Sequence, residues 1–166
     1  IAPDNGPSPA DKATSFRVVK VPLSKLRIGD FTFANPSRRI LRKEIADCDL
    51  VFSQTIGPIG MMCINLAKRE HKKVMAYIHS IEWELVTRAM GFNILKGYSY
   101  AIAKSIVRRI YKKVDLLIVP ASSISELFSW HNIKTEKKII HLGVDTKKFF
   151  PPEKKSEAKK KLGIDV

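Results

Sequence analysis

The sequence predicts an α/β fold in which a parallel sheet is covered by helices on both faces. Residues 49–53, 74–78 and 115–119 are short apolar runs whose two alternating sides are both apolar, as in strands buried on both faces. Segments with apolar residues at helical spacing separate these runs. The chain has 166 residues, of which 45% are apolar, and this is enough to bury one ordinary core.

The part of the chain before the first of these runs gives a weaker pattern. Residues 1–12 are rich in Pro, Gly, Asp and Asn, so we expect a loop there. Residues 16–21 predict a short strand, whereas residues 23–35 show no clear periodicity. Pro36 is expected to open a helix, because proline is favoured in a first helical turn and apolar residues follow at helical spacing.

Strands and helices alternate through the centre of the chain, which is typical of a parallel sheet. Residues 147–166 differ, because prolines interrupt the chain and a short basic helix at 154–162 is stopped by Gly163. We therefore expect one domain over residues 1–145 and a separate segment over residues 146–166. The central elements expected are strands at 49–53, 74–78, 115–119 and 138–142, and helices at 59–70, 82–90, 99–113 and 123–130.

The charge of the chain restricts its partners. Lys and Arg total 30 against 16 acidic residues, which gives a net charge of +14. Such a surplus favours nucleic acid, anionic lipid or phosphorylated substrates. A basic α/β binding module for nucleic acid or polyanions is therefore one functional hypothesis. The lysine pairs are spread over many elements, however, and the nucleic-acid motifs expected of such a module are absent from the sequence.

Several other classes of protein find little support. Cys48 and Cys63 are too few for a disulfide framework or zinc ribbon, and we expect free thiols in a reducing compartment. His71, His131 and His141 share no metal-ligand spacing, so we expect no metal site. No run of about 18 uncharged apolar residues predicts a membrane-spanning helix.

Three segments, in their order and spacing, resemble the amino-terminal lobe of family 4 glycosyltransferases, which are retaining enzymes of the GT-B fold. The first is the strand, loop, helix and strand over residues 49–79. The second is the strand with Pro120 and Ser122 over residues 114–122. The third, residues 137–151, is similar to the family's passage into its second lobe, although Leu142 stands where the family usually has Asn.

The resemblance implies a Rossmann-like lobe that is truncated at both ends. The family's first strand, glycine-rich loop and first helix would precede Ile1, and its second lobe would follow Val166. Residues 1–145 would then be a partial amino-terminal lobe, and residues 146–166 the inter-lobe linker and the start of the second lobe. The fragment by itself is expected to be inactive.

The function that the resemblance implies is hexosyl transfer. The lobe would bind the acceptor, either a sugar or a lipid-linked molecule, and the absent lobe would bind a UDP- or GDP-sugar donor. No other cofactor is expected. The basic charge and an amphipathic helix at 99–113 further suggest a cytoplasmic enzyme that associates peripherally with the inner face of a membrane.

Candidate site residues follow the strands of the predicted sheet, because ligands of open parallel sheets lie beyond the carboxyl ends of the strands. His79 follows one strand, and in the family a His at this point faces the sugars, so we expect it to be catalytic. Gln54, Gly57 and Gly60 follow another strand, where glycines can let a phosphate or hydroxyl approach backbone N–H groups. A simple tight turn explains these glycines equally well.

Two further acceptor-binding candidates have capping alternatives. Glu82 and Glu84 fall in a first helical turn, where carboxylates favour the helix dipole, and Ser80 is a suitable N-cap. We expect Glu82 to stabilise the helix first and to contact the acceptor second. Ser122 is a site candidate, whereas Ser123 and its following residues form a capping box.

The helix at 99–113 has an apolar stripe and a basic rim. We expect the stripe to lie in the core and the rim to contact anionic lipid head groups. A sheet position left open by the missing strand would also favour self-association. The stripe is Ile102, Ile106, Val107, Ile110 and Tyr111, and the rim is Lys104, Arg108, Arg109 and Lys112.

Overall fold

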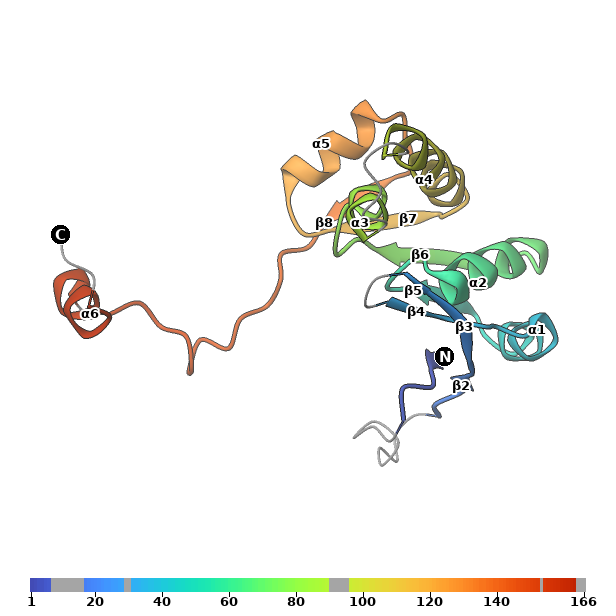
Figure 1. Ribbon diagram of the computed structural model, residues 1–166, viewed down its shortest axis with the longest axis horizontal. Coiled ribbons are helices and arrows are strands. Elements are labelled where there is room, and N and C mark those ends of the chain that lie inside the picture. Colours follow the sequence, from blue (N-terminus) through green and yellow to red (C-terminus); the bar gives the residue numbers. More distant parts are fainter. Residues whose placement is uncertain (7–16, 29–30, 90–95, 153, 164–166) are drawn as a thin grey trace.

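A computed structural model describes residues 1–6, 17–28, 31–89, 96–152 and 154–163 (Figure 1). Its centre is a parallel sheet whose strand order follows the chain order. In the register of this sheet, Phe52 lies beside Met75, and Met75 lies beside Leu116. The predicted α/β class with a Rossmann-like parallel sheet is confirmed. The strands are β5 (Leu50–Ser53), β6 (Lys73–Tyr77), β7 (Leu116–Val119) and β8 (Lys137–Ile139).

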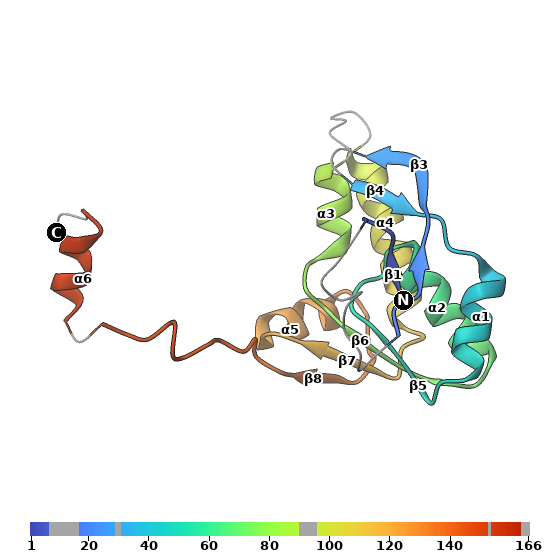
Figure 2. The same cartoon turned by 90° about the horizontal axis from the view of Figure 1, so that it is seen from below.

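The helices between residues 38 and 130 lie on one side of this sheet (Figure 2). α2 connects β5 to β6, α3 and α4 connect β6 to β7, and α5 connects β7 to β8. Of the expected helices on both faces, the described residues therefore supply those of one face. The helices are α1 (Arg38–Ala46), α2 (Pro58–Arg69), α3 (Glu82–Ala89), α4 (Lys96–Tyr111) and α5 (Ser122–Trp130).

The two faces of the sheet differ in burial although both are apolar. On the helix-covered face, Val74, Leu117 and Val119 are fully buried. On the opposite face, Leu50 is 44% exposed and Phe52 is 48% exposed. Side chains further along that face are half-buried by their own neighbours on the sheet, namely Met75, Tyr77, Leu116 and Ile118. We call this second surface the open face.

Aromatic packing joins the helices of the covered side. Trp83 on α3 and Phe128 on α5 lie with their ring centroids 5.1 Å apart, and Tyr111 on α4 lies 5.6 Å from Phe128. All three side chains are fully buried. Large aromatic side chains contribute strongly to core stability, so this cluster holds α3, α4 and α5 together.

The amino-terminal part contains two small sheets, and one of their strands lies within the segment 16–21 where a strand was expected. β1 (Ala2–Pro3) pairs in parallel with β2 (Lys20–Val21), so the loop expected over residues 1–12 includes a strand. β3 (Leu23–Ile28) and β4 (Phe31–Ala34) form an antiparallel hairpin. Phe16, the first residue of the strand expected there, lies outside the described residues. These short strands depend on their pairing partners, which local periodicity does not report.

The end of the chain leaves the body of the molecule after β8. Residues 140–152 form a segment without helix or strand, with a turn at 146–148, that leads toward α6 (Lys155–Lys161), which stands apart from the sheet (Figures 1 and 2). The domain boundary expected near Asp145 lies within this segment and stays a prediction. No helix in the described part of the chain is long and apolar enough to cross a membrane.

Candidate functional site

The carboxyl ends of the strands form one edge of the molecule and bring together candidates from three loops. Gln54 follows β5, His79 lies two residues after β6, and Ser122 begins α5 after β7. Because β6 lies between β5 and β7, His79 is at the centre of this row. We call this arrangement the carboxyl edge.

His79 is the first residue of its strand segment to leave the sheet. The N–H of Ile78 still donates to the carbonyl of Ile118 at 3.0 Å, whereas the side chain of His79 is exposed. Its ring packs edge-on against Tyr77, with ring centroids 4.4 Å apart. Within the described residues, no hydrogen bond occupies its imidazole nitrogens, so the ring is held from one side and open to a ligand on the other.

The loop after β5 is tightly built, and Gly60 is part of that construction. The buried Ser53 hydroxyl donates to the carbonyl of Thr55 at 2.6 Å. A Cβ at Gly60 would lie 1.9 Å from this carbonyl oxygen, so only glycine lets α2 approach the loop so closely. The N–H of Gly57 donates to the Thr55 hydroxyl at 3.2 Å. These contacts favour the tight-turn interpretation of both glycines, whereas Gln54 is exposed at the edge.

Glu82 points into the interface between α3 and α4. One carboxylate oxygen accepts a hydrogen bond from the Tyr111 hydroxyl, and the other, Oε2, is buried without a partner among the described residues. Burial raises the pKa of Glu82, although the Tyr111 hydrogen bond and a backbone N–H act in the opposite direction. Burial and the neighbouring Glu82 charge both raise the pKa of Tyr111. This placement favours a structural role, and acceptor binding by Glu82 stays a prediction.

Two capping predictions are wrong. α3 begins at Glu82, and its N-cap is Ile81, whose carbonyl accepts from Glu84 and Leu85 at 3.0 and 3.1 Å. Ser80 therefore lies one residue too early to cap. α5 begins at Ser122 with Ala121 as its N-cap, and no side chain caps it. Because this helix starts one residue earlier than expected, Ser123 is already inside its first turn.

The apolar stripe of α4 is only partly in the core. Val107, Ile110 and Tyr111 are buried as expected. Ile102 and Ile106 are 60% and 45% exposed, so their predicted burial is wrong. The five residues span a wider arc of the helix than the core covers. Tyr98, which is 75% exposed, extends the exposed line at intervals of four residues. This outer stripe of Tyr98, Ile102 and Ile106 was missed, although its spacing is visible in the sequence.

Of the predicted cations, Arg109 follows Ile106 by three residues and lies on the side of the outer stripe, whereas Lys104 and Arg108 lie on another side of α4 and Lys112 follows its end. Arg108, Arg109 and Lys112 are exposed. Lys104 is half-buried, and its Nζ lies 5.5 Å from the centroid of the Tyr100 ring. The exposed surface of α4 therefore combines an apolar stripe with cations, of which Arg109 continues the stripe, and membrane-surface helices also combine apolar and basic residues.

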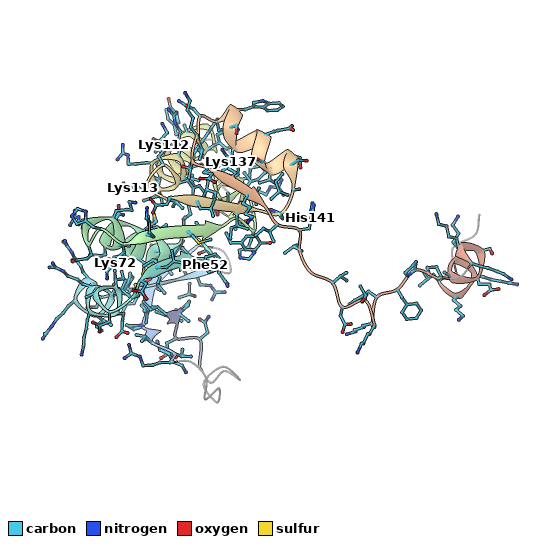
Figure 3. All side chains as sticks on the ribbon, turned by 180° about the vertical axis from the view of Figure 1, so that it is seen from behind. Phe52, Lys72, Lys112, Lys113, Lys137 and His141 are labelled. Atoms are coloured by element: carbon cyan, nitrogen blue, oxygen red, sulfur yellow. The ribbon has the colours of Figure 1, made fainter. Side chains whose placement is uncertain are left out.

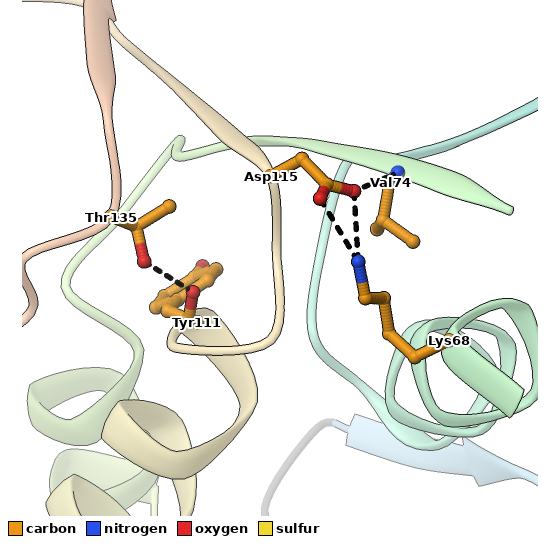
Figure 4. A network of polar contacts seen from close by, with 5 residues as sticks. All are labelled: Lys68, Val74, Tyr111, Asp115 and Thr135. Carbon is orange, nitrogen blue, oxygen red and sulfur yellow. Dashed lines mark hydrogen bonds and ion pairs between the residues drawn. The ribbon is translucent and has the colours of Figure 1, made fainter. Parts of the chain in front are cut away.

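The opposite, amino edge of the sheet contains an ion pair that sequence reasoning did not anticipate (Figure 4). Lys68 Nζ donates to both oxygens of Asp115 at 2.9 and 3.1 Å, and the Val74 N–H donates to Oδ2 at 2.8 Å. Slight burial raises the pKa of Asp115, but the Lys68 and Val74 hydrogen bonds and the charges of Lys68 and Lys73 outweigh this and lower it. The pair ties α2 to β6 and β7.

Figure 3 shows the separation of the two edges, with Lys112 and Lys113 at one end of the body and His141 at the other. His141 Nδ1 lies 3.0 Å from the carbonyl oxygen of Pro120, so this histidine supports the turn after β7. Among the described residues, no three metal-ligating side chains gather in one place.

Comparison with known proteins gives two matches. The family model described as Glycosyltransferase Family 4 matches residues 1–148. The chain is also similar to the alpha-monoglucosyldiacylglycerol synthase of Streptococcus pneumoniae (strain ATCC BAA-255 / R6), with 27% identity over 146 residues. This match covers 88% of the chain and 32% of the relative, so the chain spans about a third of the relative's length.

Proposed function

Because the chain belongs to glycosyltransferase family 4, we propose that it forms the acceptor-binding part of an enzyme that transfers a hexose, with retention, to a membrane lipid. The exposed His79 at the centre of the carboxyl edge is the observation that carries this proposal. The donor is a UDP- or GDP-sugar held by the part of the enzyme outside this chain. The 166-residue chain alone does not catalyse the transfer.

His79 contributes hydrogen bonding at the reacting sugar. An imidazole can donate a proton at one nitrogen and accept at the other, so it can orient two hydroxyls or stabilise charge that develops during transfer. Its edge-on packing against Tyr77 fixes one side of the ring and leaves its nitrogens available. Gln54, on the loop after β5, and Ser122, at the start of α5, are the polar groups to either side that would contact the acceptor hydroxyls.

A lipid acceptor is supported by the outer side of α4. Tyr98, Ile102 and Ile106 present apolar surface to solvent, and the cations that follow them match anionic head groups. The name of the Streptococcus pneumoniae relative describes the synthesis of a glucosylated diacylglycerol. A diacylglycerol-type acceptor at the cytoplasmic face of a membrane accounts for both observations, and the enzyme would bind that membrane peripherally.

Turnover by the complete enzyme tests the role of His79. We expect His79→Ala to lower kcat on the order of 10²- to 10³-fold, as loss of a group that acts in the transition state does. The matched control is His71→Asn, at the turn after α2 near the opposite edge, where asparagine tolerates the positive φ of 54°. Equal, small losses in both variants, at unchanged Tm, would show that His79 is not catalytic.

Binding to vesicles tests the lipid part of the proposal. Anionic vesicles should retain the protein at low salt, and the double variant Ile102→Ser with Ile106→Ser should weaken this retention about tenfold, since these side chains are exposed and cost little stability when changed. Lys160→Gln on α6 is the control. Equal retention by neutral and anionic vesicles contradicts the proposal, and tighter binding to nucleic acid than to vesicles would favour the basic binding module instead.

A further inference from the structure

Two neighbouring hollows lie on the surface of α2. The first has a volume of about 620 Å³, and its lining combines the apolar Pro36, Pro58, Met61, Met62 and Leu66 with Asn35, Arg38, Asn65 and Arg69. The second has a volume of about 460 Å³ and is lined by cations. Asn65 and Arg69 line both hollows, so the two are adjacent. We call the combined feature the α2 groove.

The lining of the groove changes character along the helix. Pro58, Met62 and Asn65 recur at intervals of three or four residues, and Arg69 follows four residues later, so they lie on one side of α2. A helix of 12 residues is about 18 Å long, and this sets the length of the groove. Its start, near the carboxyl edge, is apolar. Its end, near the amino edge, is basic.

The basic half carries more positive charge than its surroundings neutralise. Lys68, Arg69, Lys112 and Lys113 line it together with a single carboxylate, that of Asp115. The carboxyl ends of α2 and α4 add about half a negative charge each. Four cations against one carboxylate and two helix ends leave an excess of about two positive charges, so stabilising the helix ends does not account for the whole cluster.

Two of these cations are held in place and two are available. Lys68 is paired with Asp115 at 2.9 Å. Lys113 Nζ donates to Asn65 Oδ1 at 2.5 Å, and Asn65 in turn donates to the carbonyl of Met61 at 2.8 Å. Arg69 and Lys112 are exposed and have no side-chain partner in the described part of the chain. The groove therefore presents two positioned cations beside two that can close on a ligand.

We propose that the α2 groove binds a single-chain anionic amphiphile, with a phosphate head in the basic half and an acyl chain in the apolar half. Arg and Lys match a phosphate by charge-assisted hydrogen bonds. Methionine side chains adapt their shape to flexible apolar ligands. Nucleic acid has no chain that would fill the apolar half, and the cations of the basic half would repel a second copy of this chain, whose net charge is +14, from this groove. The site is separate from the carboxyl edge and does not depend on sugar transfer.

Calorimetric titration of the 166-residue chain with three probes tests this proposal. Decanoyl lysophosphatidate, below its micelle concentration, carries both parts of the ligand. Inorganic phosphate carries the head alone, and monodecanoylglycerol carries the chain alone. We expect lysophosphatidate to bind at least about tenfold more tightly than either single part, because each buried CH₂ and each charge-assisted hydrogen bond adds to affinity.

Variants separate the two halves. Met61→Gln should weaken lysophosphatidate binding several-fold and leave phosphate binding unchanged, whereas Arg69→Gln and Lys112→Gln should each weaken both by about tenfold. Lys160→Gln on α6 is the matched control for charge alone, and an unchanged Tm verifies each fold. The proposal is overturned if phosphate or monodecanoylglycerol binds as tightly as lysophosphatidate, or if Lys160→Gln lowers affinity as much as Lys112→Gln.

Discussion

The covered and open faces of the central sheet have similar side chains and different surroundings. Leu117 points toward the helices and is fully buried, whereas its neighbour Ile118 points to the open face and is half-buried. On β5 the open face leaves Phe52 48% exposed. An apolar pattern therefore shows that a surface is able to be buried, and it is the presence of a packing layer that decides whether burial occurs.

The largest expected effect comes from neighbouring residues on the two faces. Leu117→Ala should lower the free energy of unfolding by about 2–5 kcal/mol, because it leaves a cavity beneath the helices. Ile118→Ala should cost about 1 kcal/mol, since its side chain already contacts water. Urea unfolding of both variants measures the difference. Equal losses would mean that the open face is covered in solution.

A second prediction concerns the hydrogen bond beneath the helices. Tyr111→Phe should lower the free energy of unfolding by about 1–3 kcal/mol, because the Glu82 carboxyl loses its partner while it remains buried. Thr135→Val is a useful comparison, since the Thr135 hydroxyl donates to the Tyr111 carbonyl at 2.8 Å and touches the same turn (Figure 4). If Tyr111→Phe lowered the free energy of unfolding no more than a substitution at an exposed position does, the Tyr111–Glu82 hydrogen bond would not stabilise the interface.

The raised pKa of Glu82 gives the same interface a pH dependence. A carboxyl with a higher pKa in the folded state binds its proton more tightly there. The contribution of Glu82 to the free energy of unfolding is therefore largest at low pH. This contribution should fall as pH rises from the pKa of the unfolded chain, near 4.5, through the pKa of the folded state, and it should then stay constant. Glu82→Gln should remove this part of the slope, which chemical unfolding at pH 4 to 8 will reveal. An unchanged slope of the free energy of unfolding against pH would mean that a group other than Glu82 titrates in this range.

The exposed apolar residues of the open face predict self-association. β5 is one of the two outer strands of the described sheet and carries the two most exposed apolar residues of the open face, Leu50 and Phe52. We expect weak dimers that strengthen with salt, because the net charge of +14 opposes association and screening shortens its reach from about 10 Å at 0.1 M to about 3 Å at 1 M.

Sedimentation velocity measures this association. Phe52→Ser should raise the dimer dissociation constant about tenfold, which corresponds to about 1.4 kcal/mol. The matched control is Leu85→Ser, which changes a similarly exposed apolar residue on α3 and should have no effect. If both variants behave alike, neither the edge nor the open face of the sheet drives the association.

The smallest effect is expected at the amino edge, where water surrounds the Lys68–Asp115 pair. Asp115→Asn should cost about 0.5–1 kcal/mol at neutral pH, since partly exposed ion pairs contribute little. The lowered pKa of Asp115 means that its contribution is present above pH 4 and is lost as pH falls through the folded pKa. Acid unfolding of the two proteins should therefore converge at low pH, and curves that stay apart would contradict this assignment.

Sequence reasoning found the features that depend on local pattern. The strands β5, β6 and β7 follow from uninterrupted apolar runs, and the place of His79 follows from the strand before it. The buried hydrogen bond of Glu82 was harder to predict, because its partner Tyr111 is 29 residues away and only the packing of α3 on α4 brings them together. The exposure of Ile102 and Ile106 was also not predictable, because periodicity identifies an apolar stripe but does not show whether another element packs on it. The α2 groove needs the fold, since its cations come from α2 and from the end of α4.

The order of the strands has a consequence for how the chain acquires its structure. β5, β6, β7 and β8 lie side by side in the order in which they are synthesised. Each new strand is therefore added to an edge that already exists, and no earlier pair has to open to admit it. Pairing strands that are neighbours in the sequence costs less closure entropy than pairing strands that are further apart. The sheet is thus suited to growing strand by strand as the polypeptide leaves the ribosome.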